Sequence, residues 1–135
     1  MSAYLSSFRP RFHGWTATQW FCLIAGGLLV VRGASVLLMG ESFGTPGEGW
    51  HAAFHLASGL VLVIASRNAS VAYPVVAAFA FVYGLVAVAG TIDGHDAFGV
   101  VPIDTRDNVI HFAYVAFALG TLAADRRERL AAGAA

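Results

Sequence analysis

Apolar residues along this chain gather into four long runs, which are separated by shorter polar segments. The runs cover residues 20–39, 50–66, 71–92 and 109–124. At about 1.5 Å of rise per helical residue, each would span roughly 24 to 33 Å, which is close to the hydrocarbon thickness of a bilayer. The segments between them carry glycine, proline and acidic residues. The pattern therefore predicts an all-α, integral membrane four-helix bundle.

The two halves of this region resemble each other at a few positions. The Val-Arg-Gly sequence at 31–33 corresponds to Val-Tyr-Gly at 82–84, and Ala-Phe-His-Leu at 53–56 corresponds to Val-Ile-His-Phe at 109–112. Each half would form one hairpin that crosses the membrane twice. We therefore predict two pseudo-repeated transmembrane hairpins, related by a pseudo-twofold axis along the membrane normal.

The amino-acid composition supports a membrane location, and the positions of the arginines predict how the chain is oriented in the membrane. Apolar residues make up 58% of the 135 residues, and the mean hydropathy is +0.69. Six of the eight arginines precede the first run, separate the second from the third, or follow the fourth. By the positive-inside rule these segments face the cytoplasm. We expect a multi-pass protein of the bacterial inner (plasma) membrane with both termini cytoplasmic.

This topology divides the chain into three parts. Residues 1–19 mix aromatic side chains with arginine and should lie at the cytoplasmic headgroups. Residues 20–124 form the four-helix transmembrane domain. Residues 125–135 form a basic cytoplasmic tail, which should rest on anionic lipid. Membrane lipid is thus one expected partner.

The sequence lacks the motifs of several functional classes. It has no Gly-x-Ser-x-Gly elbow, no Walker loop and no His-Glu-x-x-His helix, and little chain lies outside the bundle to form a soluble active domain. Its arginines are too few and too scattered for a nucleic-acid surface. We expect no enzymatic activity and no nucleic-acid partner.

Two segments resemble a known family. The sequence VPIDTRDNVIHFAYVAFALG at 101–120 and the sequence WHAAFHLASGLVLVIASR at 50–67 are similar to the histidine helices of the DUF4383 family of small bacterial four-helix membrane proteins. The resemblance extends over most of residues 20–124 and implies this fold, but it implies no activity. The chain reads His-Phe-Ala-Tyr at 111–114, where the family more often has His-Leu and a nearby glycine. Because of this difference, the resemblance does not predict how closely the second histidine helix packs on its neighbour.

The histidines are the main candidates for a binding site. His51 and His55 are four residues apart, so they share one helix face near the outer end of the second run. Asp107 and His111 repeat this spacing in the fourth run. Under the pseudo-twofold axis, His51, His55, Asp107 and His111 would converge and offer a ligand set for zinc or copper.

Haem is a different interpretation of the same residues. His55 and His111 occupy equivalent positions, and facing histidines of a bundle commonly serve as axial haem ligands. Arg32 lies at a similar depth in the first run; it would repel a divalent cation but pair with a haem propionate. Among the cofactors, Arg32 therefore favours haem over a metal ion. A small ligand or a proton pathway stays open as well.

A structural interpretation is the simplest of all. The histidines would be interfacial polar residues that bind no cofactor, and Arg32 would face the interior and pair with Asp107. The protein would then be a non-catalytic structural or accessory element, which packs against itself as a homo-oligomer or against a larger membrane complex. Under every interpretation we expect His55 and His111 to face each other, because polar rings avoid hydrocarbon.

Overall fold

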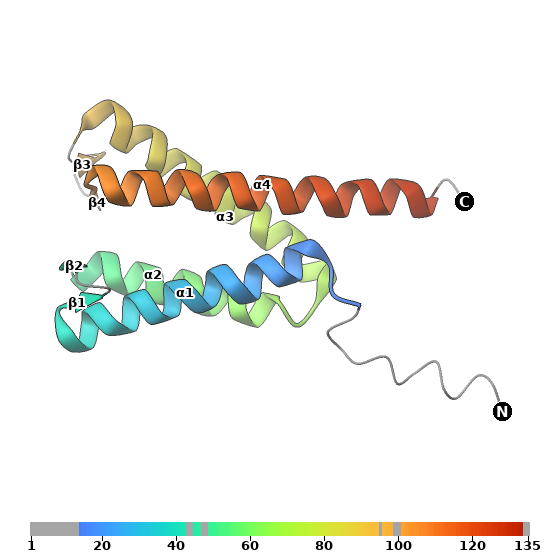
Figure 1. Cartoon of the computed structure of the whole chain (residues 1–135), viewed down its shortest axis with the longest axis horizontal. Coiled ribbons are helices and arrows are strands. Elements are labelled where there is room, and N and C mark those ends of the chain that lie inside the picture. Colours follow the sequence, from blue (N-terminus) through green and yellow to red (C-terminus); the bar gives the residue numbers. More distant parts are fainter. Residues whose placement is uncertain (1–13, 43–44, 47–48, 95, 99–100, 134–135) are drawn as a thin grey trace.

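The computed structural model describes residues 14–42, 45–46, 49–94, 96–98 and 101–133 (Figure 1). Within these ranges the chain forms four α-helices, which are α1 (Ala17–Met39), α2 (Gly49–Ala65), α3 (Ala69–Asp93) and α4 (Thr105–Gly133). Helices α1, α3 and α4 are long and apolar enough to cross a membrane, and α2 is a shorter apolar helix of 17 residues. The predicted all-α membrane fold is confirmed. The first 13 residues of the predicted N-terminal segment lie outside the described part.

Each half of the chain has the same order of elements, helix, β-hairpin, helix. The first half contains β1 (Glu41–Ser42) and β2 (Thr45–Pro46), and the second contains β3 (Asp96–Ala97) and β4 (Val101–Pro102). Both β-hairpins lie at one end of the bundle, whereas α1 begins and α4 ends at the other (Figure 1). Helix α1 packs mainly on α2, and α3 mainly on α4. The two predicted hairpins are thus present, and their matching order supports an internal repeat.

Helix α4 differs most from its predicted bounds. It begins four residues before the predicted start at 109 and continues through the predicted tail to Gly133. At about 1.5 Å per residue it is roughly 44 Å long, more than the hydrocarbon layer requires. The extension consists mostly of arginine, alanine, glutamate and leucine, which favour helix, so a change from apolar to charged residues does not end it. The part of the predicted tail up to 133 is therefore helical.

Helices α1 and α2 approach each other closely at three glycines. A Cβ atom added at Gly33 would lie 2.5 Å from the carbonyl oxygen of Ala52 and 2.6 Å from the backbone nitrogen of Leu56. A Cβ atom at Gly26 would lie 2.9 Å from the Gly59 carbonyl oxygen, and one at Gly59 would lie 2.7 Å from that of Gly26. These distances leave no room for a side chain. Backbone therefore packs directly on backbone in the first hairpin.

The second hairpin is packed less tightly. A Cβ atom at Gly84, the counterpart of Gly33, would lie 3.8 Å from Val115, an ordinary van der Waals distance. Val115 itself stands at the position that corresponds to Gly59 in the repeat. A branched side chain in place of a glycine holds α3 and α4 further apart. The sequence His-Phe-Ala-Tyr at 111–114, which departs from the family's His-Leu pattern, thus lies in the hairpin with the looser helix contact.

At the end opposite the β-hairpins, polar groups join the two halves. Asp125 of α4 is 2% exposed and accepts hydrogen bonds from the backbone nitrogens of Ala17 (2.8 Å) and Thr18 (3.2 Å) and from the Thr18 hydroxyl (2.5 Å). The first N–H groups of a helix have no partner within the helix, so a carboxylate there satisfies them and favours the helix dipole. Gln19 donates to the Ser66 carbonyl oxygen at 2.8 Å. The bonds of Asp125 thus join the two halves at this end, and the bond of Gln19 joins the start of α1 to the end of α2.

Replacing Gly33 by alanine tests the close packing of the first hairpin. Gly33→Ala should lower the free energy of unfolding by about 1 to 3 kcal/mol, because the new methyl group overlaps backbone atoms that cannot move aside. The measurement is thermal unfolding in detergent, followed by circular dichroism. Gly27→Ala in the same helix is the control, since a Cβ atom there meets nothing within 4 Å. Equal melting temperatures for the two variants would contradict the packing argument.

Candidate metal centre

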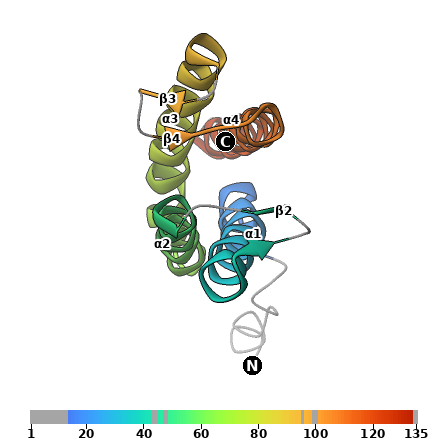
Figure 2. The same cartoon turned by 90° about the vertical axis from the view of Figure 1, so that its left-hand side faces the viewer.

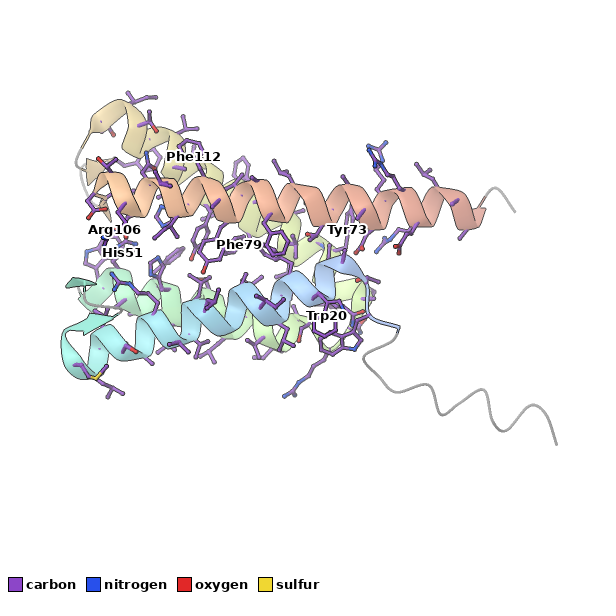
Figure 3. The ribbon with its side chains drawn as sticks, viewed as in Figure 1. Trp20, His51, Tyr73, Phe79, Arg106 and Phe112 are labelled. Carbon is purple, nitrogen blue, oxygen red and sulfur yellow. The ribbon has the colours of Figure 1, made fainter. Side chains whose placement is uncertain are left out.

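Three histidines from two helices meet near the end that carries the β-hairpins. His51 and His55 lie one turn apart on α2, and His111 lies on α4. Their exposed fractions are 9%, 7% and 3%, so all three are buried. Figure 3 shows His51 in the space between the two helix pairs. The predicted meeting of His55 and His111 is thus observed, and His51 joins them.

The imidazole rings are close enough to share one ligand. One ring nitrogen from each histidine can be chosen so that all three atoms lie within 4.8 Å of one another. The ring centroids of His51 and His55 are 4.3 Å apart, and that of His111 lies 6.1 Å from the first and 6.0 Å from the second. The described residues contain no other such group of histidine, cysteine or acidic side chains. The cluster is therefore distinctive within the described chain.

Two of the ring nitrogens are buried without a hydrogen bond. Within the described residues, His55 Nε2 and His111 Nδ1 have no partner. An unpaired polar atom inside a protein costs about 1 to 3 kcal/mol, and membrane protein interiors offer little water to replace the partner. When it carries no proton, each nitrogen can accept a hydrogen bond or bind a metal ion. A ligand between the rings would satisfy both.

An aromatic and apolar wall lies beside the histidines. The Tyr83 ring stacks on His55 at a centroid distance of 6.3 Å and meets His111 edge-on at 5.3 Å. The Tyr83 hydroxyl forms a hydrogen bond of 2.9 Å with Ser58, and the Ser58 hydroxyl donates to the His55 carbonyl oxygen at 3.2 Å. A cavity of about 180 Å³ adjoins the cluster, and Phe54 and Val82 also line it.

Arg32 and Asp107 lie at the edge of this site. Both side chains are half-buried. Arg32 interacts electrostatically with His55 and with Asp107, and Asp107 interacts with His51. This placement agrees with the expected inward orientation of Arg32. Asp107 does not belong to the group whose ligand atoms lie within 4.8 Å, so the structure brings together three of the four predicted metal ligands.

The dimensions fit a single ion better than a haem. Pockets for drug-sized ligands are about 300 to 1,000 Å³, whereas the cavity that the histidines line has about 180 Å³, and no histidine lines the neighbouring cavity of about 310 Å³. His51 and Tyr83 also pack against His55 and His111, where the flat macrocycle would have to lie. The haem interpretation therefore does not fit the packing.

The fold and the site together define a small integral membrane protein of four helices with a buried histidine cluster. Comparison with family models places residues 39–124 in DUF4383, which is described as a domain of unknown function. The chain belongs to this family. The match begins at the last residue of α1, so it covers less of the chain than the resemblance noted above. Searches of curated proteins and of solved structures find no match.

The internal repeat also points to Tyr83 as part of this site. The repeat pairs Arg32 with Tyr83, since each stands between a valine and a glycine. Residues at equivalent positions should lie near the same axis, so Tyr83 was as strong a candidate as Arg32 for the wall of the site. The hydrogen bond from Tyr83 to Ser58 had no sequence signal, because it depends on the crossing of α2 and α3.

The charge of Arg32 should weaken the binding of a cation by the histidines. Arg32→Gln removes a positive charge that acts on His55, so Zn²⁺ should bind about tenfold more tightly. Isothermal titration of the detergent-purified protein with Zn²⁺ measures this affinity. Arg67→Gln is the control, since Arg67 is exposed and follows α2 at the opposite end of the bundle. An unchanged affinity in Arg32→Gln would show that Arg32 does not act on the ion.

Proposed function

We propose that this protein is a non-catalytic integral membrane protein that binds one Zn²⁺ or Cu²⁺ ion through His51, His55 and His111. The observation that carries the proposal is the burial of three imidazoles around a common point, with unpaired nitrogens on two of them. Imidazole nitrogen is a preferred ligand of both ions. The described residues around the cluster supply no thiolate, since Cys22 belongs to the hydrophobic core.

Small side-chain movements would complete the coordination. A tetrahedral ion with metal–nitrogen distances of about 2.1 Å holds its ligand nitrogens about 3.4 Å apart. The nitrogens now lie within 4.8 Å of one another, so shifts of about 1 Å bring them into place. Asp107 interacts with His51 and is the nearest candidate for the fourth position, which water can also fill. A carboxylate there would offset part of the charge of the ion.

Metal binding to the purified full-length chain tests this proposal. After removal of metals by a chelator, the protein should bind one Zn²⁺ or Cu²⁺ per chain, measured by elemental analysis and titration. His55→Ala and His111→Ala should each lower the affinity by about 100-fold or more, because even changes beside a metal ligand cost about 10- to 100-fold. Cys22→Ala is the control, since it removes the one thiol and leaves the cluster intact.

Two results would contradict metal binding. The first is the absence of bound ion in the native protein, and the second is an equal affinity in the histidine variants. Either result would support the alternative, in which the cluster is structural and the protein is an accessory element that packs against itself or against a larger membrane complex. The melting temperature gives an independent check, since an ion that binds only the folded state raises it.

We also propose that the protein lies in the bacterial inner membrane, with the start of α1 and the end of α4 in the cytoplasm. Arg126, Arg127 and Arg129 are exposed on the extension of α4, and Arg67 is exposed in the turn after α2. These residues lie at the same end of the bundle, opposite the β-hairpins. Clustered arginines at one end favour a cytoplasmic location.

Cysteine labelling in intact cells tests this orientation. In a Cys22→Ala background, a cysteine introduced by Gly47→Cys should react with a membrane-impermeant maleimide added outside, because it lies between α1 and α2. The matched substitution Arg127→Cys should react only after the cells are opened. The reverse pattern would show that the arginines face the outside.

A further inference from the structure

Two apolar cavities lie next to each other in a crevice between α2 and α3. The first, of about 180 Å³, adjoins the histidine cluster, and the second, of about 310 Å³, extends along the helices toward Leu62 and Val75. Phe54, Val82 and Tyr83 line both cavities, so the two are adjacent. The crevice therefore runs from the histidines toward the middle of the bundle.

The crevice arises because α2 and α3 each pack on a different neighbour. Helix α2 is held against α1, while α3 leans toward α4 after the short turn that joins it to α2 (Figure 2). Phe54, Val61 and Val82 along the crevice are 42%, 55% and 40% exposed. The crevice consequently opens at the outer surface of the bundle, where membrane-spanning helices meet hydrocarbon.

The walls restrict what can fill the crevice. The Ser58 hydroxyl donates to the His55 carbonyl oxygen at 3.2 Å and lies 2.9 Å from the Tyr83 hydroxyl, which can donate to it, so both O–H groups have an acceptor. Water would find few partners there, and an empty space would lose the dispersion contacts of its lining. A further protein helix is too thick, because its diameter is about 10 Å and three turns occupy on the order of 1,000 Å³. A single hydrocarbon chain is thin and apolar enough.

We propose that one acyl chain of a membrane phospholipid lies in this crevice and covers the lipid-facing side of the histidine cluster. The chain enters sideways from the bilayer between α2 and α3, and its contacts are with Phe54, Val61 and Val82. This site is separate from the proposed ion, because the lipid touches the apolar wall and not the ring nitrogens. It covers the histidines on the side that faces lipid and completes the packing between α2 and α3.

Lipid retention by the purified full chain tests the site. After extensive washing in detergent, the native protein should retain about one phospholipid per chain, measured by native mass spectrometry and by analysis of the extracted lipid. Ala78→Trp should remove this lipid, because Ala78 lines the crevice and an indole ring there fills it. Val88→Trp is the matched control on the same helix, since Val88 is 49% exposed but lines neither cavity.

A second substitution keeps the test independent of folding. Val61→Trp fills the crevice from α2, and both tryptophan variants should keep the circular dichroism of the native protein while losing the lipid. Retention by Ala78→Trp and Val61→Trp at the level of Val88→Trp would overturn the proposal. So would a washed native protein without lipid, or one that retains a prenyl compound in place of phospholipid. None of these results depends on whether the histidines bind an ion.

Discussion

The direct contact of backbone on backbone between α1 and α2 determines where the other parts of this bundle lie. Gly33 packs against the turn of α2 that runs from Ala52 to Leu56, which is the turn that carries His55. Arg32 is the neighbour of Gly33, so its depth in the membrane is fixed beside that histidine. Because α2 is held close to α1, it stands away from α4, and the imidazoles occupy the space between the two hairpins. The crevice toward α3 has the same origin.

The two ends of the bundle treat their buried polar groups differently. At the end opposite the β-hairpins, Asp125, Thr18 and Gln19 all have hydrogen-bond partners, and the cost of burying them is thereby offset. Near the β-hairpins, the described part of the chain gives His55 Nε2 and His111 Nδ1 no partner. A membrane interior makes such unpaired atoms costly, and a bound ligand would offset that cost. This contrast is the physical reason for proposing a ligand at the end with the β-hairpins and a structural role for the polar groups at the other end.

The sequence predicted the parts of this structure that depend on periodicity and on the repeat. Runs of apolar residues gave the four helices, and the equivalence of His55 and His111 led to their meeting. The sequence could not show which face of a helix packs closely. The pairs Ala53 with Ala57 and Ala116 with Gly120 have the spacing of a close helix contact, yet these residues are exposed, while Gly26, Gly33 and Gly59 make the contact. Small residues are common on every face here, so spacing alone does not select one.

Other differences have equally local causes. Asp107 has the same spacing from His111 as His51 has from His55, but this spacing does not predict how far the looser second hairpin sets Asp107 from the cluster. The length of α4 was underestimated because hydropathy marks where a helix leaves the membrane, not where its hydrogen bonds end. The choice between haem and an ion required the volume beside the histidines, which depends on the angle at which α3 crosses α2. The position of Asp107 and the volume beside the histidines thus depend on how the helices pack against one another.

The bond from Asp125 to the start of α1 also bears on the history of the repeat. In the alignment of the two halves, the position of Asp125 corresponds to Ala69, which has no carboxylate. In this alignment the second hairpin, and not the first, carries an acid that bonds to the start of its partner. The most apolar 18-residue window of α4 has a mean hydropathy of 1.2, against 2.1 for that of α1, so the less apolar helix carries this acid. Asp125 thus adds to the cap that Thr16 already gives the start of α1, and these additional hydrogen bonds form only where α4 packs against α1.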